Sequence, residues 1–160
     1  MFLHEDKELF RDVIEATAEE LKRPAAIVEK DYYVTMILKL LEKAPECVFK
    51  GGTSLSKCHH AIDRFSEDID IAFSNELTQG QRKHLKNEII AGISQSLGLP
   101  ISDWDRTRSR RDYNCYTFDY IFADDFCYQF LLHNEEKAGG MSDADYSDCR
   151  KCSPWLYADY

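Results

Sequence analysis

A unit of strand, glycine turn, helix and strand is predicted between residues 47 and 73, and it constrains the fold more than any other stretch. The apolar run Cys47–Phe49 leads into the turn Gly51–Thr53, and a helix is expected over residues 54–64. Residues 68–71, Asp-Ile-Asp-Ile, alternate acidic and apolar side chains, which is typical of a half-buried strand. This order of elements favours an α/β domain.

Two carboxylates share one face of the second predicted strand. Side chains at i and i+2 point to the same side of a strand, so Asp68 and Asp70 are expected on one face. Ile69 and Ile71 then point the other way, into a core. Paired carboxylates suit Mg²⁺ and the phosphates of a substrate, and two metal ions about 4 Å apart can stabilise a leaving pyrophosphate. The alternative is a solvated strand face, because exposed acids are common.

The Gly-Gly-Thr turn also suits a phosphate. Glycine lets the backbone approach an anion closely, and the N–H groups at the start of a helix point toward that anion. Gly51, Gly52 and Thr53 are therefore candidate phosphate-binding residues, and Lys57, one helical turn later, is placed to reach a phosphate oxygen. An ordinary tight turn with a helix cap would explain the same residues. The turn and the acids together are more specific than either alone.

The composition is that of a globular chain, with 160 residues, 44% hydrophobic and 31% charged. This length suits one domain. No apolar run is long enough to span a membrane and the start lacks a signal-peptide pattern, so a cytoplasmic location is expected. The formal net charge of −9 argues against broad nucleic-acid binding. The six cysteines are expected to be reduced, and Cys149 and Cys152 form only half a zinc-site pattern.

Helical periodicity flanks this unit on both sides. Two N-terminal helices are predicted, over residues 5–22 and from Pro24 to about Lys43, and a third over residues 78–97 with Gly98 as its C-cap. The expected apolar face of the first helix comprises Phe10, Val13, Ile14, Thr17 and Leu21. The expected face of the third comprises Leu85, Ile89, Ile93 and Leu97.

Strand patterns follow the third helix. Residues 113–122 alternate, with the aromatic side chains Tyr116, Phe118, Tyr120 and Phe122 on one face. Residues 126–132 predict one more short strand. Residues 134–160 fit no period and are expected to form an irregular tail.

The motifs KGGTSLSK (50–57) and DRFSEDIDIAF (63–73) resemble the AbiEii/AbiGii toxin family of nucleotidyltransferases, within the DNA-polymerase-β-like superfamily. VEKDYYVTMIL (28–38) is similar to the family's N-terminal helix, and the likeness covers roughly residues 20–123. The resemblance implies a mixed sheet flanked by helices, a nucleoside triphosphate bound with Mg²⁺, and transfer of a nucleotide to an acceptor. Some members modify the acceptor end of tRNA and act as bacterial toxins paired with an antitoxin, and abortive phage defence is one use.

The resemblance also implies roles for individual residues. Gly51, Gly52 and Thr53 would bind the triphosphate, and Lys57 would neutralise part of its charge. Asp68 and Asp70 would hold the metal ions. Ser66 would cap a helix or contact a phosphate, and Arg64 would pair with Asp68 or reach the nucleotide. For these two residues an ordinary N-cap and a surface ion pair are the alternatives.

The chain also departs from the superfamily pattern. A third carboxylate is usual on a later strand, but the corresponding segment Phe126–His133 contains no acid. Asp119, on an earlier strand with an alternating pattern, is the best substitute, and Glu135 and Glu136 are weaker candidates. The helical domain that follows in family members is expected to be absent. The expected organisation is therefore a nucleotidyltransferase-like domain over residues 1–133, with helices to residue 45 and a catalytic core over 46–133.

Three hypotheses follow from the sequence. The first is a magnesium-dependent nucleotidyltransferase toxin, with tRNA as a candidate acceptor. The second is a truncated, inactive remnant that binds a nucleotide or a protein partner. The third is a small interaction domain whose acids are merely solvated. Metal-dependent nucleotide binding separates the first two hypotheses from the third, and turnover separates the first from the second.

Overall fold

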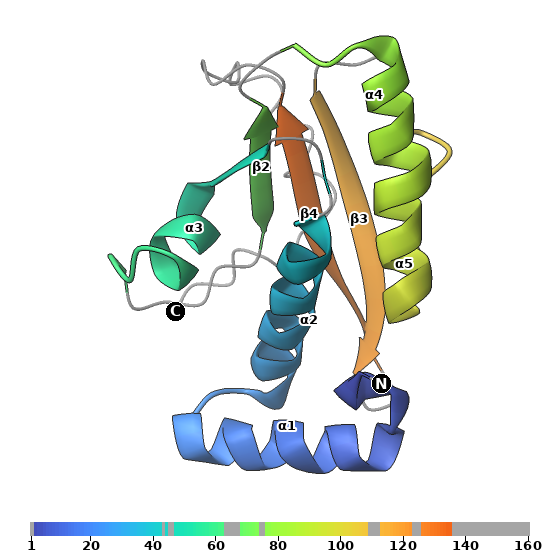
Figure 1. Ribbon diagram of the computed structural model, residues 1–160. Coiled ribbons are helices and arrows are strands. Elements are labelled where there is room, and N and C mark those ends of the chain that lie inside the picture. Colours follow the sequence, from blue (N-terminus) through green and yellow to red (C-terminus); the bar gives the residue numbers. More distant parts are fainter. Residues whose placement is uncertain are drawn as a thin grey trace.

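The computed structural model describes residues 2–42, 44, 47–62, 68–73, 76–108, 113–122 and 126–135. Helices come first in the chain, and two consecutive strands end its described part (Figure 1). In order, the elements are η1 (Leu3–Glu5), α1 (Lys7–Leu21), α2 (Ala25–Leu41), β1 (Cys47–Lys50), α3 (Gly51–Lys57), β2 (Ile69–Phe73), α4 (Gln79–His84), η2 (Leu85–Ile90), α5 (Ala91–Leu97), β3 (Tyr113–Phe122) and β4 (Phe126–Glu135). The α/β class and the two N-terminal helices are confirmed.

The four strands form one mixed sheet in the order β1-β2-β4-β3. β1 pairs antiparallel with β2, β2 pairs parallel with β4, and β4 pairs antiparallel with β3. The mixed sheet that the family resemblance implied is therefore present. β2, the strand of the acidic motif, lies between two neighbours, and Asp70 is the backbone partner of Lys50 on β1 and of His133 on β4.

The hydrophobic core lies between the helices and one face of this sheet. Ile69 and Ile71 of β2 are buried, as the alternating pattern predicted. They pack in one cluster with Tyr116 and Phe118 of β3 and with apolar residues of α1, α2, η2 and α5. Because neighbouring residues of a strand point to opposite faces, Asp70 projects from the face opposite the core.

The helical run over residues 79–97 agrees closely with its prediction. Thr78 and Gln81 form a capping box at its start, and Gly98 ends it with a left-handed backbone (φ 65°). The predicted buried side chains are buried: Leu85, Ile89, Ile93 and Leu97. A π-helical stretch, η2, lies between α4 and α5.

The buried face of α1 differs from its prediction. Phe10, Ile14 and Ala18 face the core, whereas Val13 and Leu21 are 38% and 50% exposed. α1 crosses the end of α2 in Figure 1 and packs against α2 and η1. A helix that meets its neighbour at a crossing buries one narrow stripe, so the wider predicted face was wrong.

Within the described residues, no helix combines the length and the apolar character that a bilayer-spanning segment requires.

Candidate functional site

The glycine turn is the first turn of α3. β1 ends at Lys50, and Gly51 begins the helix with a left-handed backbone (φ 76°). The helix was expected over residues 54–64, but it starts three residues earlier and ends at Lys57. It ends there because the chain turns away through His60, whose φ of 49° is also left-handed. The candidate Arg64 lies outside the described residues.

Gly51 and Asp70 are in close contact. A Cβ atom at residue 51 would lie 2.0 Å from Oδ2 of Asp70 and 2.9 Å from its Cγ. The contact arises because Lys50 and Asp70 are paired positions of β1 and β2, so the turn that follows β1 begins beside the acid. Only glycine fits this position without displacing the carboxylate, which places the start of α3 directly against the acidic motif.

A second contact ties the same turn to the other acid of the motif. The buried hydroxyl of Thr53, 1% exposed, donates a hydrogen bond to the backbone carbonyl of Asp68. The hydroxyl hydrogen of Thr53, a candidate phosphate-binding residue, is therefore directed at a backbone carbonyl of the protein. Thr53 fixes the first turn of α3 to the segment that enters β2, and a role for Gly52 and Thr53 toward a nucleotide would fall to their backbone N–H groups.

Asp68 and Asp70 suit a divalent cation that is shared with a substrate. Both residues are half-buried, and Oδ1 of Asp68 is a buried atom. The part of the chain that the structure describes contains no group of three or more histidine, cysteine, aspartate or glutamate side chains arranged to hold a metal ion. Mg²⁺ is commonly held by one or two carboxylates, with phosphate and water oxygens as its remaining ligands. The two acids therefore fit Mg²⁺ that arrives with a triphosphate.

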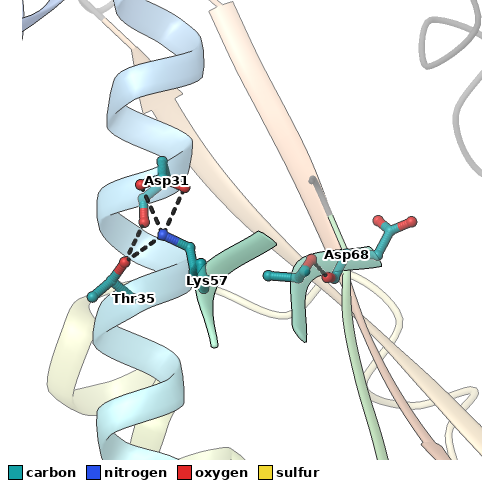
Figure 2. A network of polar contacts seen from close by, with 5 residues as sticks. Asp31, Thr35, Lys57 and Asp68 are labelled. Atoms are coloured by element: carbon teal, nitrogen blue, oxygen red, sulfur yellow. Dashed lines mark hydrogen bonds and ion pairs between the residues drawn. The ribbon is translucent and has the colours of Figure 1, made fainter. Parts of the chain in front are cut away.

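Lys57 points toward α2. Its Nζ lies 2.7 and 2.8 Å from the two carboxylate oxygens of Asp31 and donates a hydrogen bond to Oγ1 of Thr35 at 2.9 Å. Figure 2 shows these three side chains together, with Asp68 lying apart from them. The ammonium that was predicted to reach a phosphate is thus held by two residues of α2.

The structure does not bring Asp119 to the acidic pair. β4 lies between β2 and β3, and Asp119 lies four residues along β3 from Cys115, the residue level with Asp70, so the two positions are roughly 16 Å apart in the sheet. Its backbone pairs with Gln129, and its carboxylate accepts a hydrogen bond from the hydroxyl of Ser102 at 3.2 Å. Ser66 lies outside the described residues.

Sequence reasoning missed two residues of α2 that hold Lys57, and the buried Glu29 on the same helix. Asp31 and Thr35 are one helical turn apart and hold Lys57, but no local pattern indicates a partner 26 residues along the chain. Glu29 is 5% exposed, and burial raises its pKa from 4.5 to about 7. Its i, i+4 spacing from the buried Tyr33 was the available signal that Glu29 faces inward.

Comparison with known proteins decides the family. The family model described as nucleotidyl transferase AbiEii toxin, type IV TA system, matches residues 35–128, which is more than half of the chain. The chain belongs to the AbiEii family. No curated protein and no solved structure matched it.

The AbiEii match covers the glycine turn and the acidic motif that the geometry brings together. It includes the glycine turn and both acids of the Asp-x-Asp motif, and it ends within β4. Membership places the chain in a family of nucleotidyl transferase toxins of type IV toxin–antitoxin systems. An antitoxin partner is implied by this class of system. Asp31, on α2, lies before the first matched residue.

Proposed function

We propose that this AbiEii-family chain transfers a nucleotide from a nucleoside triphosphate to an acceptor hydroxyl, with the end of a tRNA as the candidate acceptor. Family membership supports nucleotidyl transfer. The single structural observation that carries the proposal is the contact of Gly51 with Asp70, which joins a phosphate-binding type of turn to a metal-binding type of acid pair. The reaction is assigned to the cytoplasm, where both substrates occur.

The triphosphate would lie between the turn and the acids. The first N–H groups of a helix have no partner within that helix, so those of Gly52 and Thr53 are suited to phosphate oxygens. Asp68 and Asp70 would hold Mg²⁺, and the bound ion would offset the negative charge of the phosphates. The carboxylates would otherwise repel the triphosphate, so binding is expected to require the metal.

The transfer step is a substitution at phosphorus. The acceptor oxygen attacks the α-phosphorus, the bond between the α-phosphorus and the bridging oxygen breaks, and pyrophosphate leaves with the bonding electron pair. The proton of the acceptor hydroxyl passes to a site carboxylate or to solvent. The residues of this chain contribute mainly position and charge, as is usual in phosphoryl transfer.

The test is isothermal titration of each of the four nucleoside triphosphates, with and without Mg²⁺. The wild type is compared with a double variant, Asp68→Asn with Asp70→Asn, and with Glu88→Gln as a matched control on the exposed face of η2. We expect saturable binding that requires Mg²⁺, is lost in the double variant and is kept in the control. Transfer of an α-labelled nucleotide to tRNA is then measured with the nucleotide that binds.

Absence of magnesium-dependent binding for all four nucleotides would refute the proposal. Equal binding by the wild type and the double variant would refute the assignment of the site. A chain that binds a nucleotide with Mg²⁺ but transfers none would match a second candidate function, nucleotide binding without turnover. The position of Asp119, two strands from the acids, favours this second candidate.

A further inference from the structure

Lys57 joins the last residue of α3 to the middle of α2. Both oxygens of Asp31 lie within 2.8 Å of its Nζ, and Asp31 and Lys57 are only 29% and 22% exposed. The pair is therefore partly shielded from solvent, and its hydrogen bonds are charge-assisted. Such a pair is better placed to hold a fixed geometry than an exposed surface pair.

Thr35 supplies a further oxygen atom to the ammonium of Lys57, and the direction of its own hydroxyl hydrogen is fixed within α2. Its hydroxyl donates a hydrogen bond to the backbone carbonyl of Asp31 at 2.9 Å, one helical turn earlier. With the hydroxyl hydrogen directed there, a lone pair of Oγ1 is left to accept the hydrogen bond from Lys57 at 2.9 Å. The ammonium of Lys57 is thus surrounded by three oxygen atoms of one face of α2 (Figure 2).

α3 depends on such contacts. It has seven residues, begins without a side-chain cap, and leaves Leu55 46% exposed. A helix this short is not stable alone, because the cost of its first turn is recovered only over several further turns. Thr53 fixes the first turn of α3 to Asp68, and Lys57 fixes the last turn to α2.

We infer that Asp31 and Thr35 are positioning residues for the nucleotide site, and that Lys57 is the tether through which they act rather than a ligand of the triphosphate. By holding the end of α3, they fix the position of the turn Gly51–Thr53 relative to Asp68 and Asp70. This inference deepens the proposed function and rests on it for its effect on nucleotide binding. The tether itself can be tested without a nucleotide.

The first measurement is a double-mutant cycle on the dissociation constant of the magnesium–nucleotide complex. Asp31→Asn and Lys57→Met, which keeps most of the lysine stem, are compared singly and together. A tether predicts that each single variant weakens binding about tenfold and that the double variant is no weaker than the weaker single variant. A phosphate ligand predicts instead that Lys57→Met weakens binding while Asp31→Asn, which frees the ammonium, leaves it unchanged or tighter; that result would overturn the inference.

The second measurement is hydrogen exchange of the backbone amides of α3 in the protein without nucleotide. Both single variants are expected to exchange faster over residues 51–57, and the double variant no faster than either. Lys39→Met, at an exposed position of α2, is the matched control and should not change this exchange. Unchanged exchange in Asp31→Asn would overturn the tether. Faster exchange in a protein that binds no nucleotide would keep the tether and reject the proposed function.

Discussion

Gly51 and Asp70 are packed so closely that no side chain fits between them, since a Cβ atom at residue 51 would lie 2.0 Å from Oδ2 of Asp70. Two motifs that are 19 positions apart in the sequence thus form one surface. The pairing of β1 with β2 produces this arrangement, because Lys50 and Asp70 are partners in the sheet. The contact leaves no room for a larger residue at position 51 of the proposed site.

Replacing Gly51 with alanine should damage both stability and nucleotide binding. The new Cβ meets the Asp70 carboxylate, and the left-handed backbone (φ 76°) is unfavourable for alanine. We expect the free energy of unfolding to fall by about 1–3 kcal/mol, measured by urea denaturation, and magnesium-dependent nucleotide binding to be lost. Gly92→Ala in α5 is the control, because nothing lies within 4 Å of its added Cβ. It should be neutral or stabilising by up to about 1 kcal/mol.

Replacing Thr53 with valine should loosen the start of α3. Valine keeps the volume of the buried side chain but removes the hydrogen bond to the carbonyl of Asp68. The expected loss is about 1–2 kcal/mol of unfolding free energy, with weaker nucleotide binding in the same titration. Thr53→Ser keeps the hydroxyl and should retain the nucleotide affinity. If valine and serine weakened binding equally, the hydroxyl would not be what orders the turn.

Replacing Asp119 with asparagine should change nucleotide affinity by less than about twofold. In the sheet, Asp119 lies roughly 16 Å from Asp70, and asparagine can still accept the hydrogen bond from Ser102. Titration of the magnesium–nucleotide complex into the variant tests this. A loss as large as that caused by Asp70→Asn would show that Asp119 serves the metal site after all.

Replacing Glu29 with glutamine should stabilise the protein at high pH. Burial raises the pKa of Glu29 from 4.5 to about 7, so the folded state holds this proton more tightly than the unfolded state. Wild-type stability is therefore expected to fall as pH rises from about 4.5 to 7, by at most about 3 kcal/mol. Glutamine cannot ionise and should remove that fall.

Urea denaturation of wild type and Glu29→Gln at pH 5 and pH 8 measures this difference. The variant should match the wild type at pH 5 and exceed it at pH 8. Glu88→Gln, at an exposed position, should show no such difference. Equal stabilities of wild type and Glu29→Gln at both pH values would contradict a raised pKa.

Local patterns predicted the elements whose side chains alternate clearly between core and solvent. The strand predicted over residues 113–122 has the bounds of β3, and aromatic residues occupy every second position from Tyr116 to Phe122. The acid-apolar alternation after Glu67 likewise placed Ile69 and Ile71 in the core. Where the burial of side chains follows the repeat of the backbone, the sequence alone predicts the element and its buried face.

Features that depend on a distant partner were not predictable in this way. β4 was expected to end at residue 132, but it continues to Glu135 because Tyr113 of β3 pairs with that residue. The length of the partner strand decides this end, and the polar residues there give no strand signal. The partners of Lys57 were missed for the same reason, since its side chain reaches Asp31 and Thr35 only in the folded chain.

The sheet order has a consequence for how the toxin is made. β1, the antiparallel neighbour of β2, comes shortly before it in the chain. β4, the parallel neighbour, comes much later, because Ile69 pairs with Leu132, more than 60 positions further on. Contacts between such distant segments slow folding, because a long loop must close first. During synthesis, the strand that carries Asp70 therefore remains an open edge until the chain has been extended through β4. The sheet around the proposed site is therefore expected to close only after β4 has been synthesised.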